Sequence, residues 1–258
     1  MSAAKETNQN VQIGIKFPLP DGRLLVQGPL TYNADGLATR HNADFLKDPV
    51  FQEAYRLGTE TGRQHGIMDE MHIEWRVYVC CWAAYHAIHL PGDFVECGVF
   101  TGILSRAVVH YVNFEKTGKT FYLADTYSGI PEDQLTVTEK KLGMLSKNES
   151  YGKDTSEIVR QAFQGYSIEI IRGKVPDSLP QIKTDKICYL SIDMNIVMPE
   201  IAAAEYFWDK LVPGAIVVLD DYGWDIHFEQ KRAFDAFAER KGVKILSMPT
   251  GQGLIIKP

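Results

Sequence analysis

The sequence predicts an α/β domain with a seven-stranded sheet, parallel except for its last strand, with helices on both faces and an N-terminal helical extension. After Pro91, short and nearly unbroken apolar runs alternate with helical stretches, which is typical of parallel strands buried on both faces. The last two apolar runs are joined only by residues 248–252. Such a link is too short for a crossover helix, so this pair is expected to be antiparallel.

The N-terminal part has a different texture. Residues 1–10 are polar and read as a frayed tail, and residues 11–40 are rich in glycine and proline, with a short hairpin expected around Asp21-Gly22. We therefore divide the chain into a tail and loop-rich segment, 1–40, and one domain, 41–258.

Helical patterning begins in the second part of the chain. Asp48-Pro49 opens an amphipathic segment, and a second helix is expected from about Met71 to Leu90, where Pro91-Gly92 ends it. The later elements follow the alternation of apolar runs and helical stretches. We expect strands at 94–97, 121–124, 168–171, 187–192, 215–219, 243–247 and 253–256, and helices near 102–115, 154–164, 199–211 and 228–241.

Composition narrows the class of protein. The chain of 258 residues is 45% hydrophobic and 23% charged, an ordinary globular balance, with a net charge of -6 and no basic patch that would favour nucleic acid. The cysteines form no CxxC pair, and the polar start lacks a secretory signal, so we expect reduced thiols in a cytoplasmic protein. The apolar stretch 77–90 is too short to span a bilayer, so no membrane partner is expected.

A glycine-containing loop follows the first parallel strand. Residues 96–102 read Glu-Cys-Gly-Val-Phe-Thr-Gly and lead into a helix with Ser105 in its first turn. Gly98 permits a tight turn, and Gly102 permits a ligand to approach the backbone. Phe100 breaks the GxGxxG spacing of dehydrogenases, and Glu96 would repel a phosphate. An acid there suits the ammonium, sulfonium and ribose hydroxyls of S-adenosylmethionine, although a plain strand–helix turn is the alternative.

The second strand ends at Asp125, which is well placed to accept hydrogen bonds from two ribose hydroxyls. An Asp that merely caps a helix or lies on the surface is the alternative. Glu96 and Asp125 together therefore indicate a cofactor pocket between the first two strand ends.

Five motifs in order carry a family resemblance. They read GDFVECGV from Gly92, LADTYSGIP from Leu123, RGKVPDSLP from Arg172, SID from Ser191 and LDDYG from Leu219. Over roughly residues 45–257 the chain resembles the macrocin O-methyltransferase family, which methylates sugar hydroxyls of macrolides and related acceptors. A parallel sheet closed by a terminal hairpin is also the usual plan of class I methyltransferases, a Rossmann-like fold.

The resemblance implies a cofactor and a metal. It implies that S-adenosylmethionine is held by the loops around the first three motifs, and that Mg²⁺ is held by the last two. The implied cofactor residues are Glu96, Cys97, Gly98, Thr101, Gly102, Ser105, Asp125, Ser128 and Gly173, and the implied metal ligands are Asp193, Asp220 and Asp221. The chain departs from the family at Asn195, where a second acid is usual.

The acids also point to a metal by their placement. Asp193 and the pair Asp220-Asp221 follow two strands, and ligands bind at the carboxyl ends of strands in open α/β sheets. Mg²⁺ prefers such hard oxygen ligands, and it would activate an acceptor hydroxyl for methyl transfer. The alternative is that these acids cap turns or helices. Asp193 or His227 is a candidate general base.

Residues 126–153 separate the second strand from the next helix. A connection of this length is typically functional, and we expect a partly helical lid over the site; we call it the lid segment. The predicted function is Mg²⁺-assisted O-methyl transfer to a sugar or natural-product hydroxyl by a homo-oligomer. The alternatives are a metal-independent methyltransferase and a non-catalytic S-adenosylmethionine-binding protein, whereas a nicotinamide oxidoreductase fails on the glycine spacing and the terminal hairpin.

Overall fold

The computed structural model describes residues 30–67 and 71–258. Its residues before Phe45 form a compact unit of their own, distinct from the unit Phe45–Pro258. In the first unit, strand β1 (Tyr32–Ala34) pairs antiparallel with β2 (Leu37–Thr39). The hairpin expected around Asp21-Gly22 lies outside the described residues. No described helix is both long and apolar enough to cross a membrane.

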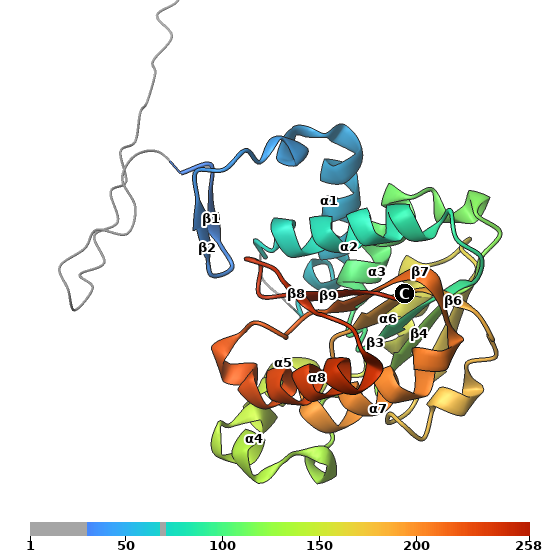
Figure 1. Cartoon of the computed structure of the whole chain (residues 1–258). Helices are drawn as coiled ribbons and strands as arrows, with labels where there is room; N and C mark the ends of the chain where they lie inside the picture. The colour runs from blue at the N-terminus through green and yellow to red at the C-terminus, as the bar shows by residue number, and fades with distance from the viewer. Residues whose placement is uncertain (1–29, 68–70) are drawn as a thin grey trace, which may run out of the picture. The chain divides into compact units, whose positions relative to one another are not determined.

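The second unit is built on a seven-stranded sheet with the order β5-β4-β3-β6-β7-β9-β8 (Figure 1). Its strands are β3 (Asp93–Cys97), β4 (Phe121–Asp125), β5 (Ile168–Arg172), β6 (Ile187–Ile192), β7 (Leu211–Leu219), β8 (Leu246–Ser247) and β9 (Gly253–Ile256). Strands β3 to β7 pair in parallel, and β9 lies antiparallel to both β7 and β8. The predicted fold class, including the antiparallel last strand, is confirmed.

Helices cover both faces of this sheet. The α-helices are α1 (Pro49–Arg63), α2 (Glu74–Ala87), α3 (Ile103–Tyr111), α4 (Val137–Lys141), α5 (Asn148–Tyr151), α6 (Ser156–Ala162), α7 (Val197–Phe207) and α8 (Phe228–Lys241). Helices α2 and α3 lie on one face, while α7 and α8 lie on the other (Figure 1). Asp48 begins α1 by accepting a hydrogen bond from the Val50 amide, with Pro49 in the first helical turn.

The strands divide their side chains between two cores, because successive residues of a strand point to opposite faces. In β3, Phe94 packs into the core under α2 and α3, and Val95 packs into the core under α7 and α8. Both side chains are fully buried. This burial on both faces explains why the strands read as continuous apolar runs.

Strand β7 begins earlier than the sequence suggests. Pro213 and Gly214 indicate a turn, but the strand runs from Leu211 through both of them. The register between β6 and β7 shifts over this stretch, and Gly214 has φ +84. An irregular pairing of this kind accommodates a proline and a glycine inside a strand.

The strand order positions the site. The chain runs from β3 to β4 on one side and later returns to place β6 on the other side of β3. Ligands bind at such a reversal, at the carboxyl ends of the strands. Here the amide of Asp193 donates to the carbonyl of Cys97, and that of Gly98 donates to the carbonyl of Ala124. The loops after β3, β4 and β6 therefore meet at one edge.

Candidate active site

The loop after β3 can only be built with glycine at two positions. Gly98 has φ +89, and a Cβ there would lie 1.8 Å from the carbonyl oxygen of Asp193. Gly102 has the same φ, precedes α3 as its N-cap, and would bring a Cβ within 2.7 Å of the Phe163 ring. Positive φ and close approach both exclude larger side chains. The loop therefore lies directly against the segment after β6.

Glu96, the residue before the end of β3, is a buried acid with an unpartnered oxygen. The side chain is 2% exposed, and its Oε2 has no hydrogen-bond partner within the described chain. Burial raises the pKa of Glu96 to about 8, opposed by a hydrogen bond from Ser105. A buried acceptor without a partner is costly unless a ligand supplies a donor. Glu96 can therefore accept a hydrogen bond from a bound molecule.

Asp125 organises the neighbouring loops. Its carboxylate accepts hydrogen bonds from the amides of Val99 (2.6 Å), Phe100 (2.8 Å) and Tyr127 (2.7 Å). Its own carbonyl accepts from the amide of Gly173. Asp125 thus joins the loops that follow β3, β4 and β5, a role that the sequence did not indicate. The hydrogen bonds to ribose hydroxyls stay a prediction.

The other predicted cofactor residues differ in accessibility. Ser128 is exposed in the turn after β4 and bonds to Thr126. Cys97 is fully buried, and Thr101 is buried with its hydroxyl bonded to Thr61 of α1 at 3.0 Å. The side chains of Cys97 and Thr101 therefore support the loop from within the fold, so only their backbone groups can reach a ligand.

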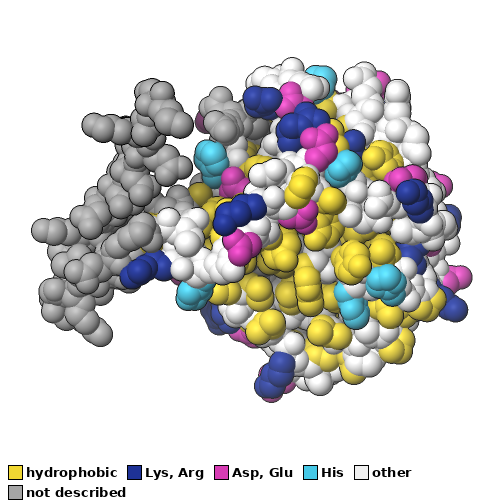
Figure 2. All heavy atoms as spheres, turned by 90° about the horizontal axis from the view of Figure 1, so that it is seen from above, with side chains coloured by type: hydrophobic (Ala, Val, Ile, Leu, Met, Phe, Trp, Pro, Cys, Tyr) yellow, Lys and Arg dark blue, Asp and Glu magenta, His cyan; other side chains and the backbone are white. Residues whose placement is uncertain are grey.

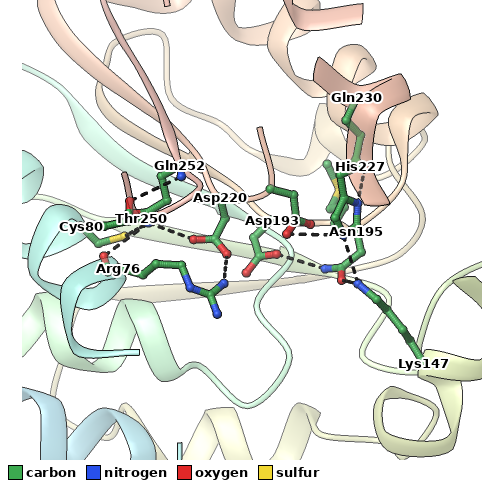
Figure 3. A network of polar contacts seen from close by, with 12 residues as sticks. Arg76, Cys80, Lys147, Asp193, Asn195, Asp220, His227, Gln230, Thr250 and Gln252 are labelled. Atoms are coloured by element: carbon green, nitrogen blue, oxygen red, sulfur yellow. Dashed lines mark hydrogen bonds and ion pairs between the residues drawn. The ribbon is translucent and has the colours of Figure 1, made fainter. Parts of the chain in front are cut away.

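The three predicted metal ligands lie together. One carboxylate oxygen from each of Asp193, Asp220 and Asp221 lies within 4.8 Å of the others. Asp220 accepts from Arg76 at 2.6 Å and from Gln252 at 2.9 Å, as Figure 3 shows. Asp221 is buried, and its Oδ2 has no partner in the described chain.

Burial and mutual repulsion raise the pKa values of carboxyl groups in this cluster. Burial, followed by the charges of Asp220 and Asp221, raises the pKa of Asp193 well above its usual range. Burial also raises the pKa of Asp221, although the neighbouring His227 opposes this. Three acids at this separation stay ionised together only with a compensating cation. Carboxylate oxygens are the donors that Mg²⁺ selects, so the residues fit the predicted ion.

A buried chain of hydrogen bonds fixes the orientation of His227. Gln230 donates through Nε2 to Glu200 at 2.9 Å, which leaves Oε1 of the same amide as an acceptor. That oxygen contacts Nδ1 of His227, so Nδ1 carries the proton and donates. The lone pair of Nε2 then faces the Lys147 ammonium at 3.3 Å, and Nε2 lies 3.7 Å from Oδ1 of Asp221. His227 is thereby oriented as a proton acceptor.

The lid segment reaches the acid cluster, as expected for a partly helical lid. Lys147 ends a single 3-10 turn, and its ammonium contacts Oδ1 of Asn195 and, at 3.3 Å, Nε2 of His227 (Figure 3). The Tyr151 ring packs against Phe100 of the glycine loop, with centroids 4.8 Å apart. The acids Asp193 and Asp221, after burial, raise the pKa of Tyr151.

The residues that the sequence did not reveal come from elements far apart along the chain. His227 and Gln230 are three residues apart at the N-terminus of α8, so both lie on one side of the helix. This spacing could have indicated their contact. No local pattern identifies the others, because only the packing of helices and lid segment brings them to the strand ends. They are Arg76, Lys147, Tyr151, Glu200 and Gln252.

Comparison with known proteins identifies the family. A family model described as macrocin-O-methyltransferase matches residues 78–247, more than half of the chain. The chain belongs to the macrocin-O-methyltransferase family. Among curated relatives, a Streptomyces olivaceus protein named 8-demethyl-8-(2,3-dimethoxy-alpha-L-rhamnosyl)-tetracenomycin-C 4'-O-methyltransferase is 29% identical over 147 residues. That match covers 53% of this chain and 55% of the relative, so it spans about half of each protein.

Solved structures agree in fold with this member of the macrocin-O-methyltransferase family. The O-methyltransferase NovP is 20% identical with a TM-score of 0.62, over 70% of this chain and 79% of NovP. CalS11, a calicheamicin methyltransferase, is 14% identical with a TM-score of 0.54, over 84% of this chain and 94% of CalS11. At these low sequence identities, the structural similarity establishes only a shared fold.

Proposed function

We propose that this chain is an S-adenosylmethionine-dependent O-methyltransferase that acts on a hydroxyl of a sugar or glycosylated natural product. The proposal rests on one relationship: the loop carrying Glu96 and Gly98 abuts Asp193 of the acid cluster. A methyl donor in that loop and a hydroxyl at the cluster would be neighbours. The S. olivaceus relative is named as a methyltransferase of a rhamnosyl-bearing tetracenomycin, which supports a sugar hydroxyl as the acceptor.

The cofactor half of the site suits S-adenosylmethionine. The unpartnered oxygen of Glu96 can accept from a cationic or hydroxyl-bearing ligand. Asp125 lies near Glu96. Oδ2 of Asp125 already accepts from the amides of Val99 and Phe100, and the carboxylate could accept from ribose hydroxyls in addition to these amides. When bound, S-adenosylmethionine supplies a methyl group attached to a positively charged sulfur, and S-adenosylhomocysteine is the leaving group.

The acceptor half suits Mg²⁺ held by Asp193, Asp220 and Asp221. The buried and unpartnered Oδ2 of Asp221 supports this assignment, because such an oxygen needs a cation or donor. When bound, the ion would act as a Lewis acid that favours ionisation of the acceptor hydroxyl. Arg76 balances part of the charge of Asp220, and the charge that remains on the cluster would be balanced by the ion.

The chain then has to remove one proton and exclude water. Nε2 of His227 can take the proton as a new C–O bond forms and the C–S bond breaks, once the acceptor hydroxyl replaces the Lys147 ammonium at its lone pair. Asp193 is the alternative base. The lid segment covers this space through Lys147 and Tyr151 and would keep bulk water from the sulfonium.

The experiment is a methyl-release assay over sugar, polyketide and phenol acceptors, with chelator-treated protein and with MgCl₂ restored. We expect turnover on a glycosylated acceptor that depends on the metal. Equal turnover in both conditions would favour the metal-independent enzyme. Absence of turnover together with tight S-adenosylmethionine binding in a calorimetric titration would favour a non-catalytic binding protein.

Titration also tests the ribose assignment. Asp125→Ala should weaken S-adenosylmethionine binding by about 1–3 kcal/mol, and unchanged affinity would exclude a role of Asp125 in ribose binding.

A cytoplasmic location belongs to the same proposal, since the four cysteines are free and buried, which suits a reducing compartment.

A further inference from the structure

Lys147 brings a positive charge to the acceptor side of the site. Its ammonium, half-buried under the lid segment, contacts two groups: Oδ1 of Asn195 and Nε2 of His227. A lysine has three N–H donors, so one remains for another partner. Figure 3 shows the side chain rising from the lid segment toward Asn195 and His227.

Both of these partners are neutral. Asn195 offers an amide oxygen, and its Nδ2 donates to Asp193 at 3.1 Å, which fixes the amide with its oxygen toward Lys147. His227 offers a lone pair, because its other nitrogen donates to Gln230. Within the described chain, no carboxylate forms an ion pair with Lys147. The ammonium is held in place by neutral partners, while its charge acts on the nearby Asp221 carboxylate and lowers the pKa of that group against the effect of burial.

The residue at position 195 determines whether the charge of Lys147 is paired. A carboxylate at Asn195 would pair directly with Lys147 and cancel its charge. The amide positions the lysine equally well and leaves the charge available. Asn195 has φ +64, a conformation that asparagine tolerates better than most residues. The other cation facing the cluster, Arg76, already pairs with Asp220.

We propose that Lys147 and Asn195 form a subsite for an anionic group, a carboxylate or a phosphate, carried by the acceptor sugar close to the hydroxyl that is methylated. This inference rests on the proposed function and names its substrate class. The third N–H of Lys147 donates to the anion, and the Asp193 carboxylate lies on the far side of Asn195, at the reacting hydroxyl (Figure 3). An acidic sugar is then bound in one orientation, and a neutral sugar lacks one contact.

The test is calorimetry with protein saturated with S-adenosylhomocysteine and MgCl₂. The probes are matched pairs: methyl glucoside with methyl glucuronide, methyl galactoside with methyl galacturonide, and glucose with glucose 6-phosphate. We expect wild-type protein to bind an anionic member about tenfold or more tightly than its neutral partner. The uronides and the phosphate distinguish the two sources of negative charge.

Three variants separate the charge from the fold. Lys147→Met keeps the length of the side chain and should remove the preference, whereas Lys147→Arg should retain most of it. Asn195→Asp should remove it as well, by pairing with the lysine. S-adenosylhomocysteine affinity and the unfolding temperature of each variant show whether it is folded.

Two results would overturn the inference: wild-type protein that shows no preference within any pair, or a Lys147→Met protein that keeps it. Methyl release onto neutral sugars without preference would refute the anionic subsite and leave the proposed function standing. Failure to transfer methyl to any acceptor, with the anion preference present, would instead count against the proposed function.

Discussion

The carbonyl oxygen of Asp193 occupies the space where a Cβ on Gly98 would stand, 1.8 Å from that position. The loop after β3 and the acid cluster are therefore in backbone contact. A side chain at residue 98 cannot be accommodated without moving Asp193, so the geometry of one half of the site depends on the other. The proposed methyl transfer would depend on this contact, because donor and acceptor must be held in line.

Gly98→Ala should therefore impair both halves. We expect at least tenfold weaker S-adenosylmethionine binding by titration, together with loss of any stabilisation by MgCl₂. The matched control is Gly118→Ala, since Gly118 also has a positive φ (+69) but open space around its Cβ position. Equal effects of the two substitutions would mean that backbone strain, and not contact with Asp193, is responsible.

The acid cluster should bind a cation that stabilises the fold. A ligand that binds only the native state raises the unfolding temperature, and the rise grows with the logarithm of its concentration above the Kd. We expect MgCl₂ to raise the unfolding temperature of wild-type protein and to leave Asp193→Asn and Asp221→Asn unaffected. Glu205→Gln is the control, since Glu205 pairs with Lys241 on the surface. If both cluster variants respond like wild type, the ion does not bind there.

Glu96 should make the ligand-free protein less stable as the pH rises. Its pKa of about 8 in the folded state exceeds the ordinary 4.5, so the folded state keeps a proton that the unfolded state releases between these values. The free energy of unfolding is then highest below pH 4.5 and falls toward pH 8, by at most roughly 1.4 kcal/mol per pH unit from this group. Urea unfolding from pH 5 to 8.5 measures this fall, which should be shallower in Glu96→Gln. Parallel curves for the two proteins would contradict the role of burial.

The exposed face of α2 should mediate self-association. Trp82 and Tyr85 are 48% and 56% exposed there, and Figure 2 shows hydrophobic side chains gathered on the face seen from above in Figure 1. Exposed aromatic patches of this kind are common at protein interfaces. Light scattering should give a mass above the 29.1 kDa of one chain. Trp82→Glu should lower that mass to the monomer value, and a wild-type monomer would refute the expectation.

The sequence predicted the sheet well because buried parallel strands leave continuous apolar runs, as in Ile187–Ile192. It also predicted that Asp193, Asp220 and Asp221, which follow β6 and β7 directly, lie together. It missed the start of β7, which runs from Leu211 through Pro213 and Gly214 and was expected only from residue 215. Contacts such as Lys147 with Asn195 join the lid segment to a distant strand end. They depend on tertiary packing, which no local pattern encodes.

The hydrogen-bond chain from Glu200 through Gln230 to His227 should control the rate of proton removal. Glu200 also accepts from the amide of Met194 at 3.0 Å, so the chain links His227 to the segment that carries Asp193. Gln230→Met keeps the volume but removes the acceptor for Nδ1 of His227. The imidazole can then place its proton on Nε2, where it can no longer accept one from the acceptor hydroxyl.

We expect kcat of Gln230→Met to fall by about ten- to a hundredfold, a part of what a general base contributes, with little change in KM or in S-adenosylmethionine affinity. Gln161→Met, on the exposed side of α6, is the control and should behave like wild type. A change of KM without a change of kcat would indicate that Gln230 shapes the acceptor pocket instead. Unchanged kinetics would leave Asp193 as the base, since the orientation of His227 would then have no bearing on the reaction.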